Sequence, residues 1–153
     1  MKTTLRIFSF LFATALMMAC ASGESEMLKQ ARTIQDDMMK DIHALDSSLN
    51  NKITSLESDL SMMSEDSTMA TDSVKLASYM KLKEKYNTAT TLQSEMVDWK
   101  SNIKMLPTVE EMNGGAENPF GEKAKDQEVL AEMKKAQADL ATMKTKVETA
   151  IKQ

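Results

Sequence analysis

Cys20, the one cysteine of the chain, is the residue whose chemistry follows most directly from its position. It comes after a basic start and the charge-free apolar segment at residues 7–18, and polar residues follow it closely. An apolar segment of this length is too short for a permanent membrane span but is typical of a signal peptide. Because small Ala19 precedes the thiol, we predict a signal peptide over residues 1–19, cleavage between Ala19 and Cys20, and lipidation of Cys20.

Met39 and His43 are the residues that could bind a metal ion. They are four residues apart, so on a helix they share one face, and a thioether beside an imidazole suits soft metals such as Cu(I). His43 is the only histidine, however, whereas a convincing site would hold several His or Met residues at repeated spacing. We therefore expect no metal and no other cofactor, and we keep a copper-handling lipoprotein that uses Met39 and His43 as the alternative function.

No motif in the sequence predicts catalysis. We find no glycine-rich phosphate loop and no HExxH, CxxC or EF-hand spacing, and the acidic residues fall on predicted solvent faces. We expect no enzyme and no catalytic residue. Trp99, the one tryptophan, has two interpretations: it closes one end of the fold with its N–H at the surface, or it is an aromatic contact for a partner.

The composition is typical of long helices in a single domain. Only 5% of the 153 residues are aromatic, and there are four glycines and two prolines. The net charge is −4, and because the leader contributes Lys2 and Arg6, the rest of the chain carries −6. An acidic protein is a poor ligand for nucleic acid or anionic lipid, so we expect no nucleic acid partner and membrane attachment only through the anchor.

Apolar residues at helical spacing predict a first helix at about residues 25–62. They recur with an eleven-residue period, which keeps them on one face of a nearly straight helix: Met27, Ala31, Ile34, Met38, Ile42, Leu45, Leu49, Ile53, Leu56 and Leu60. The polar segment that follows predicts a turn, and Asp72 is a good N-cap for the next helix.

The same spacing predicts two further helices, at about residues 73–106 and 119–152. Pro107 should end the first of them, Thr108 and Glu111 have capping-box spacing for one helical turn, and Asn118-Pro119 should begin the last helix. The apolar positions are Leu82, Tyr86, Ala89, Leu92, Met96, Trp99, Ile103 and Leu106, then Val129, Met133, Ala136, Leu140, Met143, Val147 and Ala150.

These elements predict an all-α fold: an antiparallel up-down-up three-helix bundle with long helices over residues 25–153, behind a tether at 20–24. Each predicted helix has one apolar face that needs partners, and hairpins that close on themselves would make the protein a monomer. The alternative is an oligomeric coiled coil that associates through the first helix.

Two segments, IQDDMM at residues 34–39 and MVDW at residues 96–99, resemble patterns in small helical lipoproteins of Bacteroidetes that are often labelled "viral A-type inclusion protein". The resemblance covers about residues 1–110. The chain departs from the family pattern at Gln35, where the family has histidine, and at Lys40, where it has proline. The family has no established activity, so the resemblance implies location and fold but not mechanism.

The sequence thus predicts a non-enzymatic lipoprotein of the cell envelope, anchored by lipid and expected at the outer membrane. The segment MMAC at residues 17–20 resembles the lipobox of bacterial lipoproteins, with Met17 where leucine is usual. We expect a structural or interaction role through the helical surface, with an envelope protein or a cell-wall component as the partner.

Overall fold

The computed structural model describes residues 24–121 and 123–152. Every regular element in this part of the chain is a helix: α2 (Glu26–Ser64), α3 (Ser73–Asn102), α4 (Val109–Asn113) and α5 (Asp126–Lys152). The all-α class is therefore confirmed. None of these helices is both long enough and apolar enough to cross a membrane. The predicted signal peptide, its cleavage site and Cys20 lie outside the described residues.

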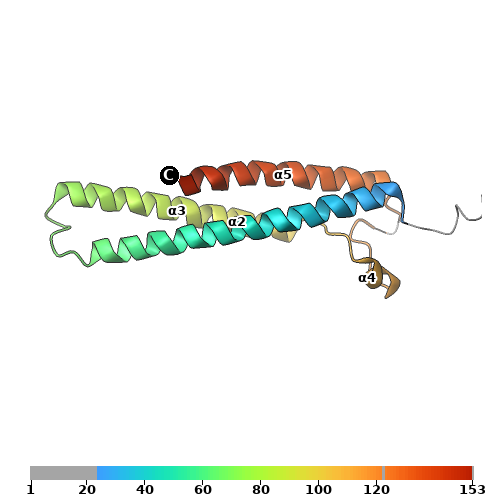
Figure 1. Cartoon of the computed structure of the whole chain (residues 1–153), viewed down its shortest axis with the longest axis horizontal. Helices are drawn as coiled ribbons and strands as arrows, with labels where there is room; N and C mark the ends of the chain where they lie inside the picture. The colour runs from blue at the N-terminus through green and yellow to red at the C-terminus, as the bar shows by residue number, and fades with distance from the viewer. Residues whose placement is uncertain (1–23, 122, 153) are drawn as a thin grey trace, which may run out of the picture.

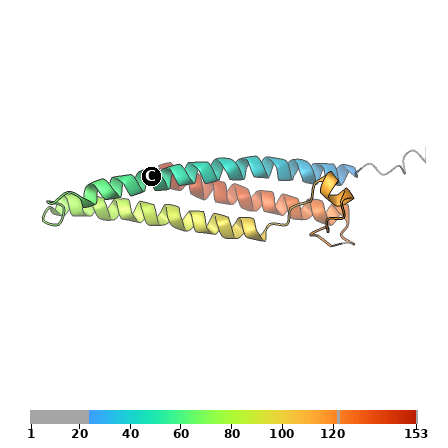
Figure 2. The same cartoon turned by 90° about the horizontal axis from the view of Figure 1, so that it is seen from below.

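The three long helices lie side by side in an elongated body (Figure 1, Figure 2). α3 runs antiparallel to α2, and α5 runs antiparallel to α3, and each of the three contacts both of the others. The turn between α2 and α3 extends beyond the C-terminal end of α5. The start of α2, the short helix α4 and the start of α5 lie together at the opposite end.

The predicted register of α2 is confirmed along most of the helix. Met38 is 1% exposed whereas its neighbour Met39 is 38% exposed, so the eleven-residue period selects the correct one of two identical side chains. The buried residues of α2 are Ala31, Met38, Ile42, Leu45, Leu49, Ile53 and Leu56. The prediction is wrong for Met27, which is 46% exposed, because it lies in the first turn of α2 and the buried stripe begins one turn later, at Ala31.

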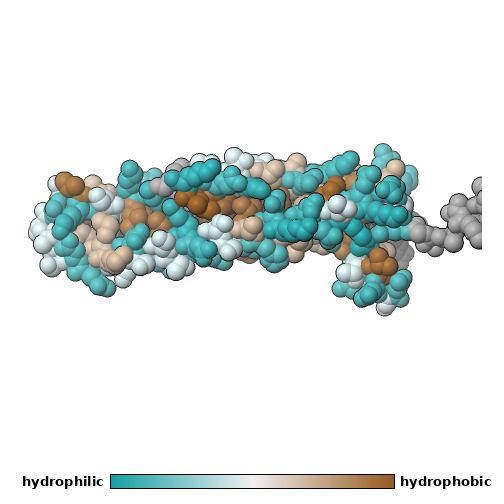
Figure 3. All heavy atoms as spheres, in the orientation of Figure 1, coloured by the Kyte–Doolittle hydropathy of each residue, from teal (hydrophilic) through white to brown (hydrophobic). Residues whose placement is uncertain are grey.

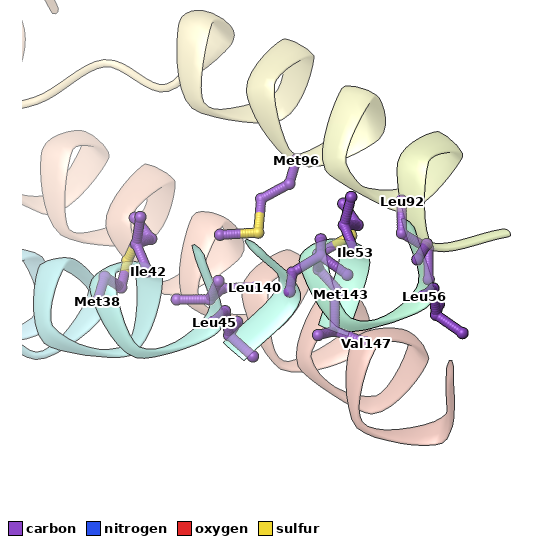
Figure 4. Packing of buried hydrophobic residues seen from close by; sticks show 12 residues of the cluster. Met38, Ile42, Leu45, Ile53, Leu56, Leu92, Met96, Leu140, Met143 and Val147 are labelled. Atoms are coloured by element: carbon purple, nitrogen blue, oxygen red, sulfur yellow. The ribbon is translucent and has the colours of Figure 1, made fainter. Parts of the chain in front are cut away.

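The core consists of two hydrophobic clusters. The larger one joins α2, α3 and α5 (Figure 4), and it contains Met38, Ile42, Leu45, Leu49, Ile53, Leu56, Ala89, Leu92, Met96, Leu140, Met143 and Val147. The smaller one, at the end where α2 begins, contains Ala31, Leu106, Val129 and Met133. Among the described residues, no polar or charged residue is buried. Full burial of one Leu, Ile, Val or Met side chain contributes about 1.5–3 kcal/mol. The two clusters together are therefore the main favourable term in folding.

Local hydrogen bonds hold the turn between α2 and α3 where the sequence predicts a turn. Asp72 caps α3 as expected, since its carboxylate accepts from the N–H groups of Val74 (2.9 Å) and Lys75 (3.2 Å). Within the turn, the carboxylate of Asp66 accepts from Lys75 Nζ (2.6 Å) and from the hydroxyl (2.7 Å) and N–H (2.9 Å) of Thr68. These bonds tie the turn to the first residues of α3.

Acid should loosen this turn, and the substitution Asp66→Asn should remove the acid dependence. The Lys75 ammonium, together with Thr68, holds the pKa of the Asp66 carboxyl well below its usual range. A carboxyl whose pKa is lowered by folding stabilises the folded turn above its ordinary pKa, and this stabilisation is lost as the pH falls through the lowered value. In an NMR titration, the chemical shift of the Thr68 amide should therefore change with a midpoint well below the pKa of an ordinary aspartate. Asp66→Asn should abolish that transition.

The control for this titration is Asp59→Asn, which changes an aspartate of α2 outside the turn. It should leave the Thr68 transition unchanged. A Thr68 midpoint at the ordinary aspartate pKa would contradict the ion pair between Asp66 and Lys75.

The predicted end of the second helix is wrong. α3 ends at Asn102 rather than at 106, and Ile103 is already extended, with φ −78° and ψ 131°. The prediction used Pro107 as the terminator, but α3 ends earlier because both backbone groups of Leu106 bind the side chain of Gln35 on α2. Leu106 still reaches the core, where it is 5% exposed.

The predicted start of the last helix is also wrong, since α5 begins at Asp126 rather than at 119. Asn118 and the proline after it form a turn in which the N–H of Gly121 binds the Asn118 carbonyl (2.8 Å) and the N–H of Phe120 binds the Asn118 side chain (3.0 Å). Gly121 has φ +95°, a left-handed conformation that favours glycine and ends the turn. The Asn-Pro pattern thus marks a turn that contains Phe120 and not a helix cap.

Candidate functional site

The start of α2 is the described part of the chain closest in sequence to the predicted anchor. Ser25 caps the helix by accepting a hydrogen bond from the N–H of Leu28 (3.2 Å), and the carboxylate of Glu24 pairs with Arg32 one turn further along. Ala19 and Cys20 precede these residues and lie outside the described part. Their cleavage and lipidation therefore stay predictions.

Two polar side chains of α2 hold the connection between α3 and α4. Gln35 binds Leu106 twice, with Oε1 accepting from its N–H (2.7 Å) and Nε2 donating to its carbonyl (3.0 Å). Arg32 donates to the carbonyl of Pro107 and contacts the sulfur of Met112 on α4 (3.4 Å). Sequence reasoning missed both roles, because these residues lie beside the apolar stripe and their partners are at least 71 residues away in the chain.

The short helix α4 is the helical turn predicted after Pro107, and the predicted capping box is confirmed. Thr108 and Glu111 cap each other's backbone N–H groups, and these hydrogen bonds lower the pKa of the Glu111 carboxyl. α4 projects from the side of the body, and Figure 3 shows a hydrophobic patch over it, beside further hydrophobic patches along the body. Val109 (52% exposed) and Met112 (41% exposed) are the exposed apolar residues of α4.

Met39 and His43, the candidate metal ligands, both lie on the exposed side of α2. A third donor would have to join them to make a tight site. In the part of the chain that the structure describes, no group of three or more His, Cys, Asp or Glu side chains is placed to hold a metal ion.

Trp99 lies at the edge of the larger core cluster and lines a hollow of about 210 Å³. The hollow is formed by the C-terminal end of α3, the Phe120 turn and one face of α5. Its apolar lining consists of Trp99, Ile103, Phe120, Met133 and Ala136. Trp99 thus packs at one end of the core and also remains accessible, so its role as a partner contact stays a prediction.

Charged side chains surround this hollow, which we call the Trp99 hollow. Its polar lining is Asn102, Lys104, Glu132, Lys135 and Asp139. The ammonium of Lys104 lies 5.8 Å from the centre of the Phe120 ring, which is within the range of a cation–π contact. The hollow therefore combines an aromatic wall with charges of both signs. Chemically it can bind a ligand through apolar, aromatic and charged contacts.

Two larger hollows differ from it in shape and lining. One of about 940 Å³ is lined by residues of α3 alone, so it is an open helix surface rather than an enclosed site. The other, of about 500 Å³ between α2 and α3, has the ion pair of Lys100 and Asp46 (2.7 Å) in its lining. The Trp99 hollow is the one of the three that three separate segments enclose.

The chain's relation to known proteins gives no further assignment of this site. Comparison with family models, with curated proteins and with solved structures gave no match.

Proposed function

We propose that this protein is a non-enzymatic lipoprotein of the cell envelope, anchored through lipid on Cys20, whose mature chain is an antiparallel three-helix bundle. The observation that carries the proposal is the position of the only cysteine, at the end of a charge-free apolar segment and four residues before Glu24. Acyl chains on this residue would supply the apolar area that stable membrane attachment needs.

The sequence distance between the anchor and α2 limits how far this end of the bundle can lie from the membrane. Glu24 is four positions after Cys20, so even an extended chain keeps it within about 14 Å of the anchor. α2 has 39 residues and is therefore about 58 Å long. An anchor at Cys20 would keep the start of α2 near the membrane, and the turn between α2 and α3 lies at the opposite end of the bundle.

The surface of the helices supports an interaction role rather than an enzymatic one. Most of the face in Figure 3 is hydrophilic, and the chain without its leader carries a net charge of −6, so electrostatic adhesion to anionic lipid is disfavoured. A protein or cell-wall component that meets the side of the bundle is the partner we propose, with Trp99 as a candidate contact. Attachment at the outer membrane is part of the same proposal.

Replacing Cys20 by alanine should detach the protein from membranes. In cells fed labelled palmitate, the wild-type chain should carry the label and sediment with membranes. The Cys20→Ala protein should carry no label, because its thiol, the acylated group, is gone. The measurements are label incorporation into the immunoprecipitated protein and its distribution between membrane and soluble fractions.

The matched control is Ser22→Ala, which alters a neighbour of the anchor and leaves the thiol in place. It should be labelled and sedimented like the wild type. Label that survives Cys20→Ala would contradict the proposed anchor.

A further inference from the structure

We infer that the Trp99 hollow binds a small aromatic zwitterion, that is, a free aromatic amino acid. Three observations lead to this class of ligand: the size of the hollow, its apolar wall and the charges at its edge. The inference does not depend on the lipid anchor, because every residue that lines the hollow belongs to α3, the two residues after it, the Phe120 turn or α5.

The size of the hollow limits the ligand to one ring with a short polar arm. Its volume is about 210 Å³. A cavity of about 150 Å³ holds a single benzene ring, whereas sites for drug-sized ligands usually measure about 300 Å³ or more. One ring with a few further atoms therefore fills the hollow, which is partly open to solvent, and any larger ligand would extend beyond it.

The apolar wall provides a place for that ring. Trp99 and Phe120 come from different segments and both line the hollow, and Met133, which is 1% exposed, belongs to the buried core beneath it. Aromatic side chains favour stacked or edge-to-face contacts with a ligand ring, which adds specificity to the burial of apolar area. An aliphatic ligand of the same charge would lack these contacts.

The charges at the edge select a ligand that carries both signs. Lys104 and Lys135 offer ammonium groups, and Glu132 and Asp139 offer carboxylates. None of these four side chains forms a salt bridge with another described residue, so their charges are available to a ligand. A ligand with only one charge would satisfy one pair and face like charge from the other, whereas an ammonium and a carboxylate on one small molecule can satisfy both.

The test is a titration of the full-length protein with four compounds, read by the fluorescence of Trp99, the only tryptophan of the chain. Phenylalanine carries the ring and both charges. Phenethylamine lacks the carboxylate, hydrocinnamate lacks the ammonium, and leucine lacks the ring. We expect phenylalanine to change the emission saturably and to bind at least about tenfold more tightly than each of the other three, since each of them lacks one charge-assisted or aromatic contact. Calorimetry of the same titrations detects binding that leaves the emission unchanged.

Two variants tie the binding to this hollow. Ala136→Leu fills it and should weaken phenylalanine binding at least about tenfold, whereas Ala141→Leu, an exposed alanine on the same helix outside the lining, should leave the affinity unchanged. Lys104→Gln combined with Lys135→Gln alters only exposed side chains. This double variant should weaken phenylalanine binding by a similar factor and strengthen that of phenethylamine, because it removes the like charge that faces its ammonium. Circular dichroism checks that each variant remains helical.

Several results would overturn the inference. Absence of both an emission change and heat with phenylalanine would exclude the site, and wild-type affinity in a folded Ala136→Leu protein would place the binding elsewhere. Equal affinity for any of the three comparison compounds would exclude an aromatic zwitterion as the preferred ligand. The Cys20→Ala protein should bind phenylalanine like the wild type, so failure of the anchor and failure of the ligand site give different results.

Discussion

Met38→Ala is expected to lower the free energy of unfolding by about 2 kcal/mol or more, whereas Met39→Ala should change it by less than about 0.5 kcal/mol. Met38 is 1% exposed and lies in the core beside Ile42, while Met39 is 38% exposed (Figure 4). Truncating the buried thioether side chain removes apolar contacts and leaves a cavity between α2 and α5. At the exposed position, the better helix propensity of alanine offsets most of the small loss.

Urea denaturation of the two variants beside the wild type measures this difference. The comparison is valid if the three m-values agree, because the same surface is then exposed on unfolding in each case. The two substitutions make the same chemical change at adjacent positions of one helix, so each is the control for the other. Equal losses would mean that Met39 is also covered, as in an oligomer that packs on the outer side of α2.

The agreement between sequence and structure is best where the apolar period alone determines burial. α2 and α5 keep a regular spacing over many turns, and of the positions predicted for α5, Val129, Met133, Leu140, Met143 and Val147 are buried. Caps were also predictable, because Asp72 and Thr108 bind N–H groups only two or three residues away. The apolar spacing and the cap residues both depend on residues that are close in sequence, so they can be read without knowledge of the fold.

The ends of α3 and α5 were not predictable, because tertiary contacts and loop geometry set them. The spacing of Ile103 and Leu106 continues the heptad of α3, yet both residues lie beyond the end of the helix. They remain apolar contacts because the extended segment returns to the core, where Leu106 packs with Val129. A pattern of apolar residues cannot distinguish a further helical turn from an extended segment that buries the same two side chains.

The candidate site was predictable only in part, because tertiary contacts that local sequence patterns do not show bring its residues together. Trp99 is the single tryptophan, and Ile103, Met133 and Ala136 are predictable as apolar positions of the helices, but Phe120 and the charged lining residues have no local motif. Phe120 lies in a connection that was expected to be helical, and Glu132, Lys135 and Asp139 look like ordinary solvated charges of a surface helix. Only the packing of α5 against the end of α3 places these charges around one hollow.

Gln35 provides the second large effect. Replacing it by leucine should cost about 2 kcal/mol, because the N–H and carbonyl of Leu106 would both lose the side-chain partner that they share in a part-buried position. Replacing it by glutamate should cost more at neutral pH. The carboxylate can still accept from the Leu106 N–H, but it cannot donate to the carbonyl and places a negative charge against that oxygen.

The glutamate variant should also become more stable, relative to the wild type, as the pH falls. A protonated carboxyl can donate to the Leu106 carbonyl as the amide does, so folding raises the pKa of the introduced group above the ordinary value of about 4.3. A group whose pKa is raised by folding contributes its full stabilisation below its unfolded pKa, and this contribution is lost as the pH rises through the folded value. Urea midpoints of Gln35→Glu and wild type should therefore converge towards about pH 4 and separate at neutral pH.

The control for that pH dependence is Gln137→Glu, the same substitution at an exposed position of α5. The difference between its urea midpoint and that of the wild type should change little with pH, since an exposed carboxyl titrates alike in the folded and unfolded chain. If the difference in urea midpoint between Gln35→Glu and the wild type were equally independent of pH, the amide of Gln35 would not hold Leu106 in solution. The end of α3 would then depend on Pro107, the burial of Leu106 and the hydrogen bond from Arg32 to the Pro107 carbonyl, and Gln35→Leu should in that case cost well under 1 kcal/mol.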